Sequence, residues 1–207
     1  MVGSPRPGDR RPLSDSPRAT TADPPLDEAY DARLVERVRN GEVEAYGELV
    51  GRHMRRAFAI AFRILEHRED AEDVVQDAFI RALERIDTLA RGRAFHPWLY
   101  RIVVNRALNV RRSRSICRTE RIPPGTPATV VSPDRSAERA ELRRRLKAAL
   151  DGLPDRQRTI VQLTELEGFS AAEAAEILGI SSATARWHLH QARRTLRKAL
   201  ETLKEEE

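Results

Sequence analysis

The sequence has little of several residue types, and each shortage excludes a class of protein. Its single cysteine, Cys117, rules out an intramolecular disulfide and a cysteine-rich zinc site. No apolar run reaches the roughly 18 residues of a membrane span, and the Pro- and Arg-rich N-terminus does not resemble a secretory signal. Aromatic residues make up only 5% of the 207 residues. We therefore expect a cytoplasmic protein with limited material for any single core and no direct membrane insertion.

Lysine is scarce as well, with only 3 lysines against 34 arginines. The 37 basic and 32 acidic residues give a formal net charge of +5. A guanidinium group suits phosphates and base edges better than an ammonium group does. Because codon bias in a GC-rich genome produces the same ratio, the composition permits nucleic-acid binding without establishing it.

Proline-rich stretches divide the chain into two helical parts. Residues 1–26 hold six of the twelve prolines and almost no large apolar side chains, which predicts a disordered tail. A second Pro-rich stretch, residues 116–136, predicts a semi-extended linker. No strand pattern occurs on either side of it. We predict an all-α protein with two small helical domains, over residues 27–115 and 137–204.

Apolar residues at steps of three and four predict amphipathic helices in both parts. Further helices are expected from Trp98 to about Ser113 and from Asp155 to about Glu167. Two stripes are expected to face the core: Tyr46, Leu49, Val50, Met54, Phe58, Ala61 and Leu65 in one helix, and Ala71, Val74, Val75, Ala78, Phe79, Ala82, Leu83 and Ile86 in the next.

The last fifty residues predict a helix-turn-helix. Ser170 and Glu173 fit a capping box at the start of a short helix. A tight turn at residues 179–181 follows, and Ser181 caps a second helix from residue 182 to about 203. In this motif the second helix enters the DNA major groove.

The second helix carries a basic and polar face opposite its apolar stripe. Arginine can bridge guanine O6 and N7, and glutamine can pair with adenine. The alternative is a solvated basic face on a bundle helix. The residues expected to contact DNA are Ser182, Thr184, Arg186, Trp187, His190, Gln191 and Arg193.

Residues 95–112 are a second candidate for nucleic-acid contact, because aromatic and basic side chains are interleaved there. Bases of a single strand stack on rings while phosphates meet arginine. Asn105 and Asn109 are four residues apart and share one helix face. The alternative is that the aromatic residues pack in the core. The candidates are Phe95, Trp98, Asn105, Arg106, Asn109 and Arg112.

An acidic block at residues 66–77 indicates a different partner. It holds six acidic residues and one arginine, and Asp73, Gln76 and Asp77 lie opposite the apolar stripe. Such a surface would repel DNA. It is either a solvated face or a docking site for a basic protein.

The sequence contains few residues in an arrangement that could support catalysis. No Gly-rich phosphate loop is present, Cys117 has no histidine nearby, and His188 and His190 point to different sides of a helix. We expect no enzyme, no cofactor and no metal site.

These groups of residues together resemble a bacterial RNA polymerase sigma factor of the extracytoplasmic-function (ECF) group of the sigma-70 family. The run DAEDVVQDAF at residues 70–79 is similar to the family's polymerase-binding helix. Residues 95–109 resemble the segment that opens and reads the −10 promoter element. Residues 153–193 resemble the helix-turn-helix that reads the −35 element. The likeness spans about residues 27–203.

The resemblance implies that residues 27–115 form sigma region 2 and residues 137–204 form sigma region 4. Asp73, Gln76 and Asp77 would bind the β′ clamp helices of core RNA polymerase, and region 4 would sit on the β flap. The implied partners are core RNA polymerase, promoter DNA and an anti-sigma factor. Trp187 and His188 depart from the family's usual pattern in the reading helix.

Two other functions would use some of the same features. A LuxR-like helix-turn-helix regulator would act without being a polymerase subunit, but it would leave the acidic helix and the aromatic-basic segment unexplained. A nucleic-acid enzyme would need carboxylates with metal spacing near the basic segments, where acidic residues are almost absent.

Overall fold

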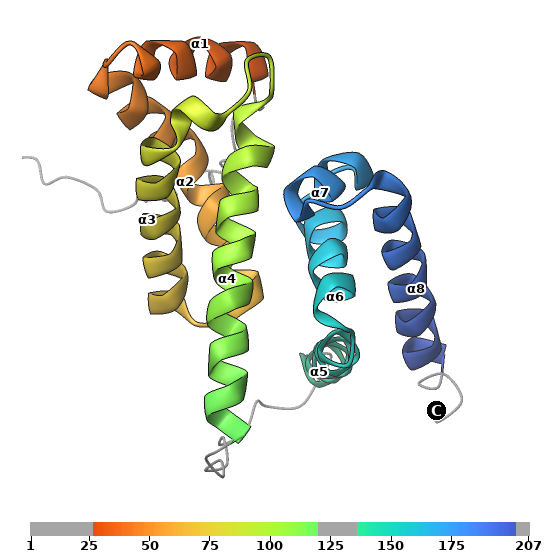
Figure 1. Ribbon diagram of the computed structural model, residues 1–207. Coiled ribbons are helices and arrows are strands. Elements are labelled where there is room, and N and C mark those ends of the chain that lie inside the picture. Colours follow the sequence, from red (N-terminus) through yellow and green to blue (C-terminus); the bar gives the residue numbers. More distant parts are fainter. Residues whose placement is uncertain (1–26, 120–135, 202–207) are drawn as a thin grey trace, which may run out of the picture.

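The structure is a computed structural model that describes residues 27–119 and 136–201 (Figure 1). The predicted tail, residues 1–26, and most of the predicted linker lie outside the described residues. Every regular element in the described part is helical, which confirms the predicted fold class. The elements are α1 (Glu28–Arg39), α2 (Val43–Leu65), α3 (Arg68–Glu84), the 3-10 turn η1 (Ile86–Thr88), α4 (Phe95–Thr119), α5 (Ser136–Asp151), α6 (Asp155–Val161), the π-helical segment η2 (Gln162–Leu166), α7 (Ala171–Leu178) and α8 (Ser182–Glu201).

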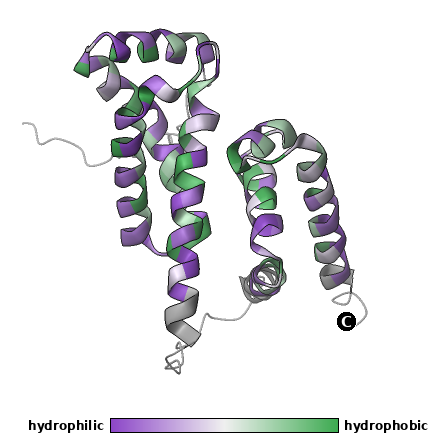
Figure 2. Ribbon diagram, viewed as in Figure 1, coloured by the Kyte–Doolittle hydropathy of each residue, from purple (hydrophilic) through white to green (hydrophobic). Residues whose placement is uncertain are grey.

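Helices α1 to α4 form the first domain, in which α3 and α4 pack on α2 and on each other. The side chain of Asp27 caps α1 by accepting from the backbone N–H of Tyr30 at 3.0 Å. Between α2 and α3, Glu66 takes up a left-handed conformation with φ 54°, so the chain reverses within two residues. Leu49, Val75 and Leu99 lie in the core between the helices. In Figure 2 the hydrophilic colour follows the outer side of α3.

The predicted core stripe of α2 is confirmed in part. Leu49 and Ala61 are buried, and four others are partly buried and pack against the core: Tyr46, Val50, Phe58 and Leu65. The buried residues of α2 include Ala45, Leu49, His53 and Ala57, whereas Met54 is 40% exposed. Helices α1, α3 and α4 all pack against this helix and cover the face that holds these buried residues. Apolar residues of α2 therefore extend past the area that its neighbours cover.

In α3, Leu83 was also expected in the core, but its side chain is 46% exposed. The remaining residues of that predicted stripe are buried. The stripe of eight positions is wider than the surface that α2 and α4 offer. Leu83 therefore lies outside it.

A chain of polar contacts crosses the interior of the first domain. His53 Nε2 donates to Asp31 Oδ2 at 2.9 Å, and His53 Nδ1 lies 3.0 Å from the Tyr100 hydroxyl. Arg52 Nε donates to the other oxygen of Asp31 at 2.8 Å. Burial alone raises the pKa of Asp31, but the hydrogen bonds and charges of His53 and Arg52 outweigh it and hold the pKa below its ordinary value. These contacts connect α1, α2 and α4.

Helix α4 is longer than the sequence pattern indicated, because it runs on to Thr119 rather than ending near Ser113. Residues 114–119 contain neither proline nor glycine, so nothing in the local sequence interrupts the helical hydrogen bonds. The last four residues of α4 thus belong to the stretch that was predicted to be linker.

Helices α5 to α8 form the second domain, and Ile160, Ile177 and Ala185 lie at its centre. The helix expected from Asp155 to about Glu167 changes its hydrogen-bond pattern at Gln162, whose carbonyl accepts from Glu167 N–H at 3.1 Å, five residues on. Such wide turns occur mostly inside helices and often at functional sites. The described helices include none that is both long and apolar enough to span a membrane.

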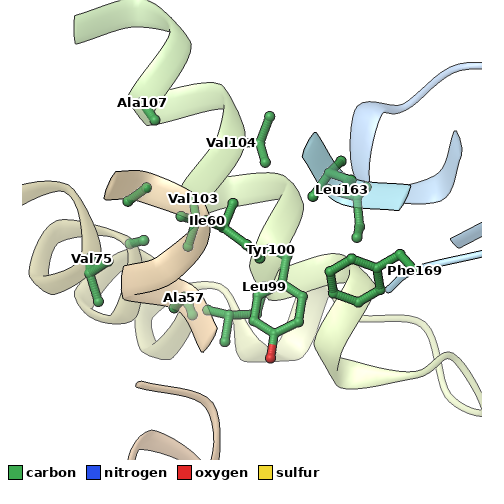
Figure 3. Packing of buried hydrophobic residues seen from close by; sticks show 14 of the residues in the cluster. Ala57, Ile60, Val75, Leu99, Tyr100, Val103, Val104, Ala107, Leu163 and Phe169 are labelled. Carbon is green, nitrogen blue, oxygen red and sulfur yellow. The ribbon is translucent and has the colours of Figure 1, made fainter. Parts of the chain in front are cut away.

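The two domains share one continuous hydrophobic core. Figure 3 shows Leu163 and Phe169 of the second domain beside Val104 and Tyr100 of α4. Tyr100 is fully buried, so α4 supplies apolar side chains to both domains. In Figure 1, α7 lies next to α4, and α8 lies on the far side of α6 and α7.

Replacing Asp31 with asparagine should lower the free energy of unfolding at pH 7 by about 3 kcal/mol, because Arg52 and His53 lose an ionised partner in a buried site. The lowered pKa of Asp31 means that its stabilising effect is complete above the ordinary pKa of aspartate and is lost as the pH falls through the folded-state value. The gap between the two proteins should therefore shrink between about pH 5 and pH 2. Urea unfolding at several pH values tests this.

Asp87→Asn is the matched control, since Asp87 is 86% exposed. It should change the free energy of unfolding by less than about 0.5 kcal/mol at every pH. An Asp31→Asn protein that shows the same acid sensitivity as the parent would contradict the role given to Asp31.

Candidate nucleic-acid interface and docking groove

Helices α7 and α8 form the predicted helix-turn-helix. Ser170 Oγ accepts from Glu173 N–H at 3.2 Å, and Glu173 Oε2 accepts from Ser170 N–H at 2.7 Å, so the predicted capping box is present. Gly179 ends α7 in the left-handed region at φ +64°, where a side chain would be strained. Ser181 then caps α8 by accepting from Thr184 N–H at 3.1 Å.

Packing against α6 and α7 fixes the orientation of α8. Ala185, Leu189 and Ala192 are buried, as the apolar stripe predicts. The opposite face therefore points to solvent. Six of the seven residues expected to contact DNA there are exposed, and Gln191 is partly buried: the exposed ones are Ser182, Thr184, Arg186, Trp187, His190 and Arg193.

Two residues on this face of α8 have local contacts that the sequence did not indicate. Arg193 donates to Glu165 at 2.6 Å, so part of its charge is balanced within the domain. Trp187 is 55% exposed and its ring meets His188 edge to face at 4.9 Å between centroids. A large ring that stands on an exposed helix face can contact a ligand without rearrangement.

On α4, five of the six expected nucleic-acid contacts fall into two groups, and the sixth, Arg106, pairs with α3. Asn105, Asn109 and Arg112 are exposed and follow one another at steps of four and three, which places them on one helix face. Phe95 is buried with its ring 5.2 Å from that of His53, and Trp98 is half-buried next to it. Of these residues, the polar stripe is thus presented to solvent, Trp98 is presented in part, and Phe95 is covered.

Arg106 and Asp77 join α4 to α3. Arg106 Nε lies 2.5 Å from Asp77 Oδ2, and Arg81 donates to the same carboxylate at 2.8 Å. Burial alone raises the pKa of Asp77, but the Arg81 hydrogen bond and the two guanidinium charges lower it below its ordinary value. Asp77 therefore has a structural role that its place in the acidic block did not suggest, whereas Asp73 and Gln76 are exposed.

An apolar groove between α2 and α3 is the main surface feature that the sequence analysis missed. Its volume is about 680 Å³, and Ile80, at 52% exposed, and Met54 lie along it. Gln76 lines the same groove, whereas the exposed Asp73 lies on the side of α3 that faces Arg106 and Val110 of α4. Its other lining residues include Tyr46, Val50, Phe58, Val75, Phe79 and Leu83, with Arg55, Arg68 and Glu72. Exposed apolar patches of this kind usually bind another protein.

A second row of apolar residues beside the core face of α2 was the signal for this groove. Tyr46, Val50, Met54 and Phe58 recur at steps of four, one position after the buried row. Two adjacent apolar rows on one helix form a wider surface than the neighbouring helices α1, α3 and α4 bury. The second row therefore stays partly exposed along the groove. Among the described residues, no cluster of three or more His, Cys, Asp or Glu side chains could hold a metal ion.

Comparisons with known proteins agree with this division into two domains. The Sigma-70 region 2 family matches residues 49–116, which cover most of α2 through α4. The Sigma-70, region 4 family matches residues 143–196, which run from α5 into α8. The RNA polymerase sigma-H factor of Pseudomonas aeruginosa is 30% identical over 193 residues, 86% of this chain and 97% of that protein. The chain belongs to the sigma-70 family.

Other relatives of this sigma factor are named ECF RNA polymerase sigma factors. The ECF RNA polymerase sigma factor SigW of Bacillus subtilis is 30% identical over 83% of this chain and 97% of its own length. SigE of Mycolicibacterium smegmatis is 35% identical over 75% of this chain, which spans 62% of the length of SigE. Within the sigma-70 family, the chain belongs to the ECF group. This sigma factor acts in transcription initiation, and none of these similarities favours the LuxR-like alternative.

Solved structures show the same fold. CnrH in complex with the cytosolic domain of CnrY matches with a TM-score of 0.62 and 30% identity, over 84% of this chain and 98% of that one. The sigma factor RpoE in complex with the anti-sigma factor NepR from Bartonella quintana matches with a TM-score of 0.54 and 25% identity, over 75% and 96%. The match to CnrH covers 84% of the chain, which is more than either domain contains, so it includes residues of both domains.

Phe95 and Asn105 should respond differently to alanine. Phe95→Ala should lower the free energy of unfolding by about 3–5 kcal/mol, because it leaves a cavity beside His53 and Trp98. Asn105→Ala should change it by less than about 0.5 kcal/mol, because that side chain is exposed. Equilibrium urea unfolding measures both. Full stability of Phe95→Ala would show that the ring is not a packing residue.

Proposed function

We propose that this sigma factor binds core RNA polymerase, reads the −10 promoter element with α4 and the −35 element with α8, and helps to open the DNA. One observation supports this most directly: two exposed polar helix faces lie on separate domains of one chain, and a groove of different character lies apart from both. The protein would act by binding alone, without catalysing a reaction. We assign residues 27–115 to region 2, 116–136 to the linker and 137–204 to region 4.

In this proposal, the exposed face of α8 enters the major groove. Arg186 stands near the N-terminal end of the helix, where a guanidinium group can bridge guanine O6 and N7. Gln191 can pair with adenine. Arg193, Arg194 and Arg197 would contact phosphates, which set the orientation of the helix without reading sequence.

The polar stripe of α4 would hold bases of the non-template strand. The amides of Asn105 and Asn109 can meet base edges, and Arg112 can meet a phosphate one turn on. Trp98 offers part of its ring for stacking, whereas Phe95 would have to leave the core to do so. Taking a base out of the stack costs a few kcal/mol. Binding energy on this scale requires no ATP.

The groove between α2 and α3 would receive the β′ clamp helices of the polymerase. Ile80 and Met54 can bury apolar side chains of a partner helix, while Glu72 and Gln76 offer a polar rim for basic or amide groups. Asp73, exposed on the side of α3 toward α4, would meet basic groups of the partner beside the groove. Asp77 would contribute mainly by orienting Arg106. The second domain would sit on the β flap, as the resemblance implies.

We place the protein in the cytoplasm, where core polymerase and DNA are found. CnrH and RpoE were solved with CnrY and with the anti-sigma factor NepR. By likeness, an anti-sigma factor would bind this chain as well.

Reconstitution with core RNA polymerase tests the proposed function. The purified chain should co-purify with core polymerase and start transcription at a small set of promoters. Mapped start sites should share two elements near −10 and −35. Failure to bind core polymerase, together with tight binding to an operator by the chain alone, would instead support a regulator.

Separate substitutions should divide polymerase binding from DNA reading. Ile80→Asp should weaken binding to core polymerase at least ten-fold, since a buried unpaired charge in an interface costs several kcal/mol. Arg186→Ala should leave that binding unchanged and cost about 1–3 kcal/mol on promoter DNA, with relaxed specificity at one position. Pull-down titrations and electrophoretic shifts measure the two effects.

Two matched variants serve as controls. Val43→Asp places the same charge on an exposed apolar residue of α2 outside the groove, and it should leave polymerase binding unchanged. Arg194→Ala should weaken binding to all sequences equally if it meets a phosphate. If Ile80→Asp and Arg186→Ala impair both activities alike, the division of labour is wrong.

A further inference from the structure

The polar face of α8 has two apolar side chains at its centre. Trp187 is the sixth residue of this helix and is 55% exposed. The helix buries its opposite side in the second domain, at Ala185, Leu189 and Ala192. With about 3.6 residues per turn, Trp187 then lies in the middle of the outward face. Ala183, one turn before it, is exposed on the same face.

Polar side chains surround this apolar centre. The neighbours of Trp187 at steps of three and four include Thr184, His190 and Gln191, and Arg186 directly precedes it. These groups can offer hydrogen bonds or charge to base edges and phosphates. An indole ring has a single N–H donor and no acceptor. Trp187 is therefore poorly suited to the contacts that its neighbours can make, and its large surface suits an apolar contact instead.

Only one of the four bases presents an apolar group in the major groove. Thymine carries its 5-methyl group there, beside the O4 acceptor, and apolar side chains recognise that methyl group by contact. A tryptophan ring offers a large, rigid surface for it. The helix rises about 6 Å from Ala183 to Trp187, which is close to two base-pair steps of ~3.4 Å each. The two side chains can thus meet neighbouring base pairs.

His188 supports the indole ring from one side. The two ring centroids are 4.9 Å apart with 70° between the planes, which is an edge-to-face contact. His188 is itself partly buried, so it gives the exposed ring of Trp187 a neighbour anchored in the domain. A ring that is already held in one orientation loses less conformational freedom on binding than a free one. Trp187 is therefore exposed and oriented before any DNA is bound.

We propose that Trp187 selects a thymine in the −35 element by covering its 5-methyl group, with Ala183 against the neighbouring base pair. This inference rests on the proposed function of α8, and it adds a specificity that the arginine and glutamine contacts do not supply. The methyl group itself, rather than a hydrogen bond, distinguishes the base at this position. Burying one methyl group corresponds to about a four-fold difference in affinity.

Base analogues that differ by one methyl group test this proposal. Holoenzyme is reconstituted from the full chain and core RNA polymerase, and its affinity is measured for a promoter at which it starts transcription. Each thymine of the −35 element is replaced in turn by deoxyuridine, which lacks the methyl group and keeps the hydrogen-bonding groups. Replacement at the thymine that Trp187 covers should weaken binding about four-fold. If that T·A pair is exchanged for C·G, 5-methylcytosine should bind about four-fold better than cytosine.

Trp187→Ala should abolish this dependence on the methyl group. Holoenzyme with this variant should bind the thymine and deoxyuridine promoters equally, so the comparison also corrects for any effect of deoxyuridine on the duplex itself. Trp187→Phe keeps an apolar ring and should retain part of the difference. Because Trp187 is exposed, both substitutions should leave the melting temperature of the chain and its binding to core polymerase unchanged.

Arg194→Ala is the matched control on the same face of α8. Arg194 is exposed and would meet a phosphate, so its loss should weaken binding to both promoters and leave their ratio at about four-fold.

Three results would overturn the inference: a −35 element without thymine, a thymine-to-deoxyuridine ratio that is the same in the parent and in Trp187→Ala at every position, or weaker core binding of Trp187→Ala with that ratio unchanged. The last result would mean that the ring contacts the polymerase. In all three cases holoenzyme still forms and starts transcription, so the proposed function stands. A chain that starts no transcription with core polymerase would remove the proposed function and this inference together.

Discussion

The burial of Tyr100 is the interaction on which most of this structure depends. Its hydroxyl meets His53, which in turn binds Asp31, so α1, α2 and α4 are fixed around one polar chain. Its ring meets Phe169 from the second domain. Since a tyrosine ring is apolar and its hydroxyl needs a partner, one side chain can satisfy both surroundings. These contacts position α4 relative to α1, α2 and the segment that precedes α7.

Because one side of α4 and one side of α8 are buried in the core, the opposite sides of these helices are left to contact DNA. On α8 the buried alanines and Leu189 leave a polar face in solvent. On α4 the burial of Phe95 and Tyr100 leaves the stripe of Asn105, Asn109 and Arg112. Both surfaces are convex and polar, as suits contact with DNA. The groove of α2 and α3 is concave and apolar, as suits a protein helix.

The contacts between the domains combine apolar packing with ion pairs. Phe169 is buried against Tyr100, and ion pairs join Arg93 to Glu176 and Arg111 to Asp155. Buried polar atoms without a hydrogen-bond partner occur both at this boundary, in His96, and within the first domain, in Asp70. The two domains are therefore joined by the same kinds of contact that hold each of them together.

The sequence by itself determined the features that depend on neighbours along the chain. The capping box at Ser170, the turn at Gly179 and the stripe of α8 were all predictable, because caps and helix faces involve residues three or four positions apart. What only the tertiary structure decided depends on distant partners. Four such features arise where separate helices meet: the ion pair of Asp77 with Arg106, the burial of Phe95, the groove beside Met54 and the contact of Phe169 with Tyr100. Local periodicity shows that a side chain is apolar or charged, but the packing of other helices decides whether it is covered.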